Sequence, residues 1–117
     1  YICYSSFAVA PAFIDENSDT VQAFVNGFQK ALEWIDGNED SEIADKVSSF
    51  FPNNPTDVLG RAIRQYKSQQ TWPKNALIGE DGYTAMRDIL IEGGLVDGRY
   101  PYQRLVRPEF ARNALSE

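Results

Sequence analysis

Apolar residues recur at helical spacing between residues 21 and 35. They stand three or four positions apart, as on one face of an α-helix: Val21, Phe24, Val25, Phe28, Leu32 and Ile35. Asn17 or Ser18 can cap the start of this helix, and Gly37 can end it. The pattern therefore predicts one long amphipathic helix with a buried face.

Four later segments also read as helices. Residues 41–51 predict a second helix before Pro52, and we expect its inward side chains to be Ile43, Val47, Phe50 and Phe51. A third helix follows Asn54-Pro55 to about residue 70, with the buried side chains Val58, Leu59, Ala62, Ile63 and Tyr66. A fourth spans about residues 80–92 before Gly93-Gly94, and a short last one begins at Pro108.

The first ten residues show a different pattern. Residues 2–10 are rich in β-branched and aromatic types and end at Pro11, which predicts a strand. Residues 7–10 are apolar on both faces, as in a strand inside a covered sheet. A lone strand leaves its backbone groups unpaired, so we expect its partner to lie outside this chain or in a second copy. The predicted fold class is mainly α, with one N-terminal strand plus about five helices.

Charge and composition narrow the choice of partners. Seventeen acidic against eleven basic side chains give a net charge of -6, which repels a nucleic acid backbone. Apolar residues make up 43% and charged residues 24% of the chain, as in folded globular domains. We therefore expect a folded protein that does not bind nucleic acid.

The residues that usually carry chemistry are scarce. The chain has no histidine and a single cysteine, Cys3, which leaves no Ser-His or Cys-His pair. Residues 36–47 start like a calcium loop, but Ser41 replaces its glycine and Val47 its bidentate acid. Glycines form no phosphate-binding motif. The sequence thus predicts no enzymatic activity, no metal site and no cofactor.

Several segments taken in order resemble one family. They are residues 7–24, Ala31-Leu32-Glu33-Trp34-Ile35, Arg64-Gln65-Tyr66-Lys67 with Trp72, residues 80–95, and residues 101–106 with Phe110-Ala111. Together they are similar to the C-terminal end of the nitrate, sulfonate and taurine type of solute-binding proteins of ABC importers, which include those for thiamine pyrimidine precursors. The resemblance covers nearly the whole chain. Ser18 and Arg107 depart from it, since members often have proline and aspartate there.

The resemblance implies a fragment of a two-lobed α/β protein of the periplasmic-binding-protein type II fold. Residues 1–117 would be a single partial domain that packs on the N-terminal lobe of the parent and lacks a complete ligand cleft. Tyr4, Ser5 and Ser6 would lie near that cleft and contact the ligand. The implied partners are a small-molecule solute, in the full-length parent, and the permease of the transporter. The parent would be extracytoplasmic, either periplasmic or a membrane-anchored lipoprotein, with a signal peptide outside this chain.

Two other hypotheses compete with this one. The chain could be an autonomous helical module that recruits a protein, although such a module would not need the strand. It could also belong to an enzyme, because a relative of the family makes the thiamine pyrimidine with histidine and a cysteine-rich motif. Neither feature is present here. We also expect the fragment to self-associate as a dimer through the unpaired strand or uncovered helix faces.

Overall fold

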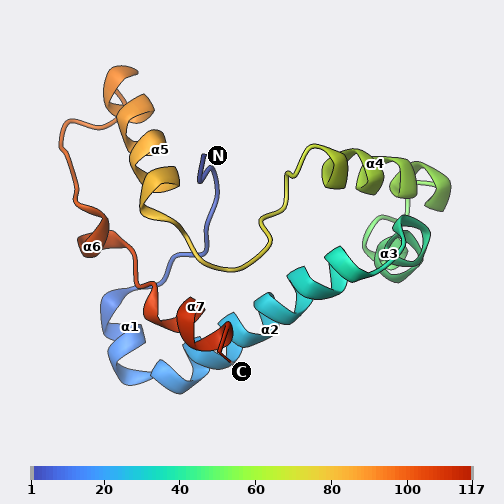
Figure 1. Cartoon of the computed structure of the whole chain (residues 1–117), viewed down its shortest axis with the longest axis horizontal. Coiled ribbons are helices and arrows are strands. Elements are labelled where there is room, and N and C mark those ends of the chain that lie inside the picture. Colours follow the sequence, from blue (N-terminus) through green and yellow to red (C-terminus); the bar gives the residue numbers. More distant parts are fainter. Residues whose placement is uncertain (1, 117) are drawn as a thin grey trace. The chain divides into compact units, whose positions relative to one another are not determined.

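The chain is mainly helical, as the sequence predicts (Figure 1). A computed structural model describes residues 2–116. Its elements are α1 (Pro11–Glu16), α2 (Ser18–Gly37), α3 (Asp40–Val47), the 3-10 helix η1 (Ser48–Phe50), α4 (Thr56–Ser68), α5 (Glu80–Glu92), α6 (Tyr102–Leu105) and α7 (Glu109–Ala114). None of the helices within residues 2–116 combines the length and apolar character needed to cross a membrane.

The predicted strand over residues 2–10 is wrong. These residues form neither strand nor helix, and no strand occurs anywhere in the described chain. The Cys3 N–H donates to the Gly82 carbonyl at 3.3 Å, a contact with the start of α5. High β propensity produces a strand only where another strand completes the hydrogen-bond ladder, and residues 2–116 offer none.

The main helices agree with the hydrophobic pattern, and their ends follow local hydrogen bonds. The predicted helix over residues 41–51 ends as α-helix at Val47 and continues as η1. There the Ser48 hydroxyl donates to the Asp45 carbonyl and the Phe51 N–H to the Ser48 carbonyl, so the last turn tightens. Helices α1 and α6 were not predicted. With six and four residues, they are too short to show a period of 3.6.

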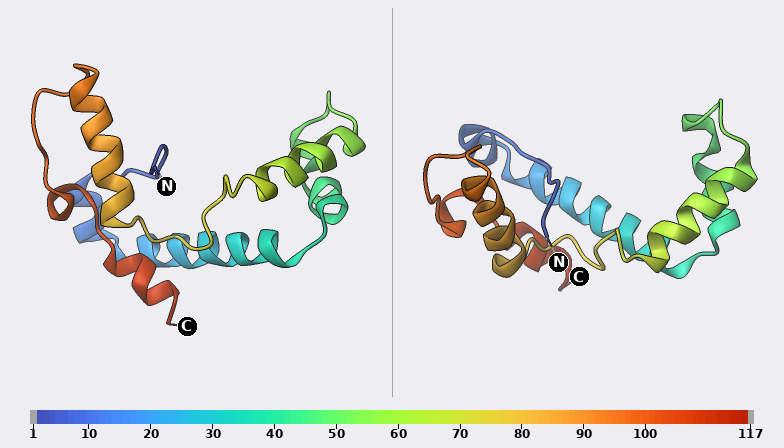
Figure 2. Two further views of the ribbon diagram at one scale, coloured as in Figure 1. Left: turned by 45° about the horizontal axis from the view of Figure 1, so that its top comes forward. Right: turned by 90° about the horizontal axis from the view of Figure 1, so that it is seen from above.

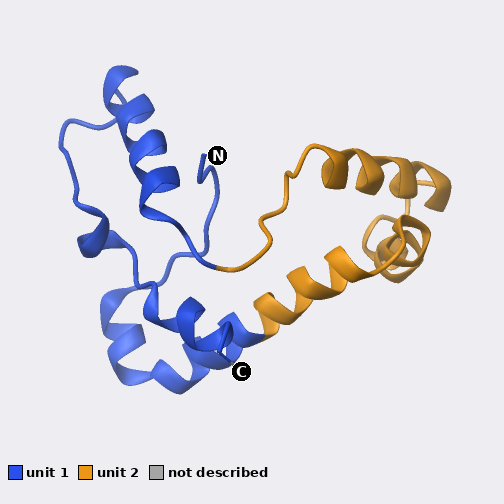
Figure 3. Cartoon of the chain, in the orientation of Figure 1, with its two compact units in different colours: residues 1–26, 77–117 blue, residues 27–76 orange. Residues whose placement is uncertain are grey.

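The chain divides into two compact units (Figure 3). Unit 1 comprises residues 1–26 and 77–117, and unit 2 comprises residues 27–76. Helix α2 contributes its first part to unit 1 and its second part to unit 2. The expectation of a single partial domain over residues 1–117 stays a prediction.

The core of unit 2 lies between α3 and α4. Ile43, Ala44 and Ile63 are buried there, and the side chains packed on them are Ile35, Val47, Leu59 and Trp72. Gly60 faces Ala44, and a Cβ built at Gly60 would lie 3.9 Å from the Ala44 Cβ. The two helices therefore approach closely where both have little or no side chain.

Unit 1 is held together by polar as well as apolar contacts. Ile14, Tyr102 and Ala111 are buried in it. The Gln22 side chain on α2 donates to the Phe110 carbonyl at 2.8 Å and accepts from the Asn113 amide at 3.0 Å, which fixes α7 on α2. Because Phe24 on α2 stays exposed, the periodic face of this helix is only partly buried.

Candidate functional site

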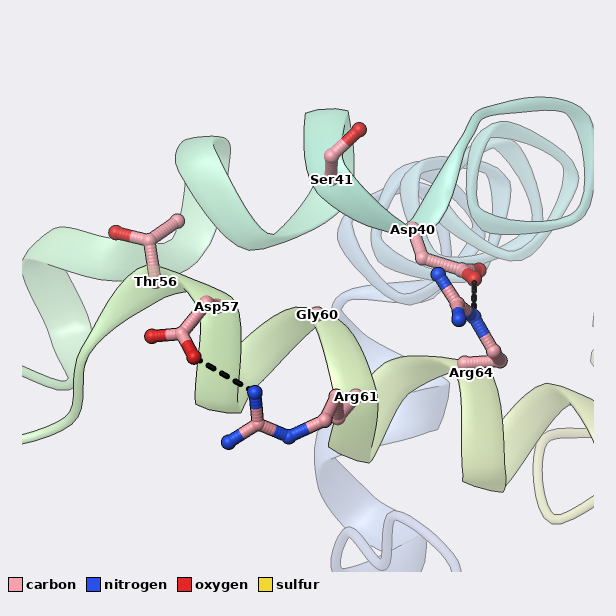
Figure 4. A pocket seen from close by; sticks show the side chains of 7 residues that line it. All are labelled: Asp40, Ser41, Thr56, Asp57, Gly60, Arg61 and Arg64. Atoms are coloured by element: carbon pink, nitrogen blue, oxygen red, sulfur yellow. Dashed lines mark hydrogen bonds and ion pairs between the residues drawn. The ribbon is translucent and has the colours of Figure 1, made fainter.

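A pocket lies in unit 2, between α3 and α4 (Figure 4). Its volume is about 350 Å³. Helix α3 contributes Asp40 and Ser41, and α4 contributes the remaining lining residues: Thr56, Asp57, Gly60, Arg61 and Arg64. The missing side chain at Gly60 leaves space along the groove where the two helices meet. The pocket is thus a by-product of the helix contact that forms the core beneath it.

The charges in this pocket are paired with one another. Arg61 Nη1 lies 2.7 Å from Asp57 Oδ2 along α4, whereas Arg64 Nε lies 3.0 Å from Asp40 Oδ2 and joins the two helices (Figure 4). The hydrogen bond from Arg61 lowers the pKa of Asp57. Lys67 Nζ lies 3.7 Å from the other Asp40 oxygen. Because each carboxylate is paired with a basic side chain, the pocket offers hydrogen-bonding groups but no isolated charge that would concentrate an ionic ligand.

Sequence reasoning did not identify these pocket residues. The sequence does place charged residues around Gly60 at helical spacing. Asp57 stands three positions before Gly60, Arg61 one position after it and Arg64 four positions after it. Such positions share one side of a helix. The pattern is common on exposed helices, however, and only the contact with α3 turns it into a groove.

The residues predicted to contact a ligand lie in the segment before α1. Tyr4, Ser5 and Ser6 are all exposed, Tyr4 with 84% of its surface accessible. The Ser5 carbonyl accepts a weak hydrogen bond from the Cys3 thiol at 3.9 Å. These three residues do not line the pocket between α3 and α4. Their role in ligand contact stays a prediction.

A tyrosine cluster stands beside the point where this segment meets α5. The Tyr83 hydroxyl donates to the Tyr100 carbonyl at 2.8 Å, and the Tyr102 hydroxyl donates to the Ile78 carbonyl at 2.6 Å. The rings of Tyr83 and Tyr102 meet edge to face with centroids 5.6 Å apart. Gly82, which accepts the Cys3 N–H, directly precedes Tyr83. The cluster therefore holds α6 and the loop before α5 next to the predicted ligand-contact segment.

Tyr102 should make unit 1 sensitive to alkaline pH. Burial raises the pKa of its hydroxyl above the usual value, with nearby Arg112 opposing and Glu80 adding to the shift. The hydroxyl of Tyr102 therefore has a higher pKa in the folded chain than in the unfolded chain. This difference stabilises the fold fully below about pH 10, where the hydroxyl is protonated in both states, and the stabilisation is lost as the pH rises through the folded-state pKa. Urea unfolding between about pH 8 and 11 should show a steeper loss of stability for the unchanged chain than for Tyr102→Phe.

The exposed Tyr4 provides the control for this substitution. The Tyr4 side chain is 84% exposed, so Tyr4→Phe should leave the urea midpoint nearly unchanged. Equal alkaline slopes for the unchanged chain and Tyr102→Phe would contradict the role given to the buried hydroxyl.

The described part of the chain shows no group of side chains placed to bind a metal ion, and three of its C-terminal arginines contact acids or an aromatic ring. Among residues 2–116, no group of three histidine, cysteine, aspartate or glutamate side chains is placed to hold a metal ion. Two of the arginines between residues 99 and 112 pair with separate acids: Arg99 with Asp88 and Arg107 with Glu109. Arg104 lies over the Tyr100 ring.

Comparison with known proteins gives one distant relative. The chain is 26% identical over 114 residues to the protein named "Putative binding protein YtlA" of Bacillus subtilis (strain 168). The match covers 97% of this chain and 34% of that protein, so the chain spans about a third of the length of the relative. No protein-family model matches the chain, and no solved structure matches it. The chain is thus a distant relative of a protein named as a binding protein.

Proposed function

We propose that this chain is a segment of the solute-binding component of an ABC importer of the nitrate, sulfonate, taurine or pyrimidine-precursor type. The observation that carries the proposal is the match of almost the entire chain to a third of a protein named as a binding protein. The order of the family-like segments along the sequence supports the importer type. Solute binding and delivery to a permease would then be activities of the longer protein.

The distribution of apolar side chains also supports a segment of something larger. Exposed large apolar residues occur in both units, among them Phe7, Leu95 and Leu105 in unit 1 and Phe50 and Tyr66 in unit 2. Burial of such apolar surface stabilises a fold by roughly 25 cal/mol per Å². In this chain these side chains leave that surface in contact with water. Soluble monomers seldom gather much of this surface. The rest of a binding protein would cover part of it.

The finer assignments belong to the same proposal. Tyr4, Ser5 and Ser6 would reach the edge of the solute cleft, most of which other residues of the longer protein would form. The protein would act outside the cytoplasm, in the periplasm or on a lipid anchor. It would bind and release its solute without chemical change.

Calorimetry with two proteins tests this function. The longer protein that carries this sequence and the 117-residue chain alone are each titrated with taurine, an aromatic sulfonate, nitrate and an aminopyrimidine. We expect micromolar binding of one solute by the longer protein and no heat from the chain alone, because the cleft is incomplete. Micromolar binding by the chain alone would contradict the incomplete cleft, and silence of both proteins toward every solute would contradict the solute class.

One observation favours the second candidate, an autonomous helical interaction module. The described residues contain no strand, so the feature that argued against a purely helical module is absent. Multi-angle light scattering separates the two candidates. We expect the chain alone to self-associate as a dimer through exposed apolar faces, whereas a stable monomer would favour the module.

A further inference from the structure

At four positions the chain joins an asparagine or an aspartate directly to a glycine: Asn26-Gly27, Asp36-Gly37, Asp81-Gly82 and Asp97-Gly98. In such a pair the glycine nitrogen can attack the side-chain carbonyl of the residue before it and close a five-membered succinimide ring, because glycine has no side chain to crowd the nitrogen. An ionised carboxylate is a poor target for this attack, whereas the asparagine amide is not ionised. The sequence alone therefore predicts that Asn26 reacts first.

Three of the four pairs lie in helices. Asn26-Gly27 and Asp36-Gly37 belong to α2, and Asp81-Gly82 belongs to the first turn of α5, where Gly82 is buried. Helical backbone angles hold the glycine nitrogen away from the side-chain carbonyl of the preceding residue. The ring can close only when that part of the helix opens. Helix formation therefore protects these three pairs.

The fourth pair, Asp97-Gly98, lies in the loop between α5 and α6, outside any helix (Figure 2). Asp97 is exposed. Within residues 2–116 the Gly98 N–H makes no backbone hydrogen bond, and the Asp97 carboxylate has no hydrogen-bond or ion-pair partner. The adjacent cation, Arg99, is paired with Asp88 instead. Nothing in the described chain therefore keeps the Gly98 nitrogen from turning toward the Asp97 side chain.

We propose that Asp97 is a modification site, at which the chain slowly converts aspartate to isoaspartate without an enzyme. The Gly98 nitrogen forms a bond to Asp97 Cγ and loses its proton, while a hydroxyl group leaves Cγ, so that one water molecule is released. Water then adds to the main-chain carbonyl carbon of Asp97 and breaks the bond from that carbon to the nitrogen. The main chain now runs through the former side chain, and no atom is gained or lost overall.

The product changes the connection between α5 and α6. Isoaspartate adds one carbon atom to the main chain and leaves a free carboxylate in place of the peptide carbonyl. Nearby in this loop, the Tyr100 carbonyl accepts the Tyr83 hydroxyl at 2.8 Å, and Arg99 Nη1 lies 3.9 Å from Asp88 Oδ1. Both contacts tie the loop to α5, so the modification alters how α6 is attached. This inference goes beyond the proposed function and does not depend on any solute.

Storage of the full chain followed by digestion with trypsin tests the site. Cleavage after lysine and arginine places the four pairs on separate peptides, which are residues 1–30, 31–46, 75–87 and 88–99. After storage at neutral pH, an isoaspartate-specific methyltransferase transfers a labelled methyl group from S-adenosylmethionine to the peptides that contain isoaspartate. We expect most of the label on residues 88–99, because the other pairs react only when their helix opens.

Storage in guanidinium chloride shows whether the fold sets this order. Without helices the pairs follow their peptide chemistry, so the label on residues 1–30 should rise above that on residues 88–99. More label on residues 1–30 than on residues 88–99 in the folded chain would overturn the proposal. Absence of label from residues 88–99 of the folded chain, when the unfolded chain is labelled, would also overturn it.

Gly98→Ala tests the attacking nitrogen. The φ angle of Gly98 is not positive, and a Cβ built there would lie 3.4 Å from the Tyr100 ring, so alanine fits after a small movement of the ring. The label on residues 88–99 should fall about tenfold, since the new methyl group crowds the nitrogen. The matched control is Gly27→Ala, whose Cβ meets nothing within 4 Å and which should leave that label unchanged. Equal label on residues 88–99 in the unchanged chain and in Gly98→Ala would contradict the reaction.

Discussion

Ile43→Ala should lower the free energy of unfolding of unit 2 by about 2 to 5 kcal/mol, the usual cost of truncating a buried isoleucine. Ile43 is 2% exposed and packs in the cluster with Ala44 and Ile63. Its neighbour Ala44 is small and already fully buried, so it cannot fill the cavity. Unit 2 has few other buried apolar side chains, which makes this loss a large share of its stability.

Urea unfolding followed by tryptophan fluorescence measures this effect. Trp34 and Trp72 both lie in unit 2, so the emission reports on that unit. Ile89→Ala is the matched control, because Ile89 is half exposed on α5 in unit 1. It should change the transition little. Similar midpoints for Ile43→Ala and the unchanged chain would show that the contact of α3 with α4 is not the core of unit 2.

Gln29→Met should destabilise the same unit by about 1 to 3 kcal/mol. Gln29 is a buried polar residue, 3% exposed. Its amide nitrogen donates to Glu33 Oε1 at 2.7 Å, and its amide oxygen accepts the Ala76 N–H at 2.9 Å. Methionine fills a similar volume but removes the acceptor, so the Ala76 N–H loses its hydrogen-bond partner.

The control for this substitution is Gln65→Met on α4. Gln65 is exposed, and its replacement should leave the urea midpoint nearly unchanged. Equal effects of the two substitutions would mean that the loss at position 29 reflects the change of side chain and not the bond to Ala76.

Much of the helical structure is predictable from the sequence because its determinants are local. The spacing of Leu32 and Ile35, the stop at Gly37 and the pair Gly93-Gly94 after α5 all act within a few residues. At Gly94 the backbone φ is +67°, the left-handed conformation that favours glycine at the end of a helix. Short helices such as α6 lack enough turns to show a period.

The failures concern features that depend on distant contacts. Residues 2–10 have the composition of a strand, but a strand also needs a partner, which sequence composition does not supply. Phe50 and Phe51 follow the helical period, yet the helix changes to η1 at Ser48 and the period no longer sets their direction. The pocket could not be predicted because it requires Gly60 of α4 to lie against Ala44 of α3.

Reconstitution from two purified pieces tests most directly whether this chain is part of a solute-binding protein. One piece is the 117-residue chain, and the other is the rest of the longer protein that carries it. We predict that neither piece alone binds the solute identified by calorimetry, and that an equimolar mixture forms a complex that binds it at micromolar concentration. Full binding by the other piece alone, or a mixture that forms no complex, would contradict the assignment.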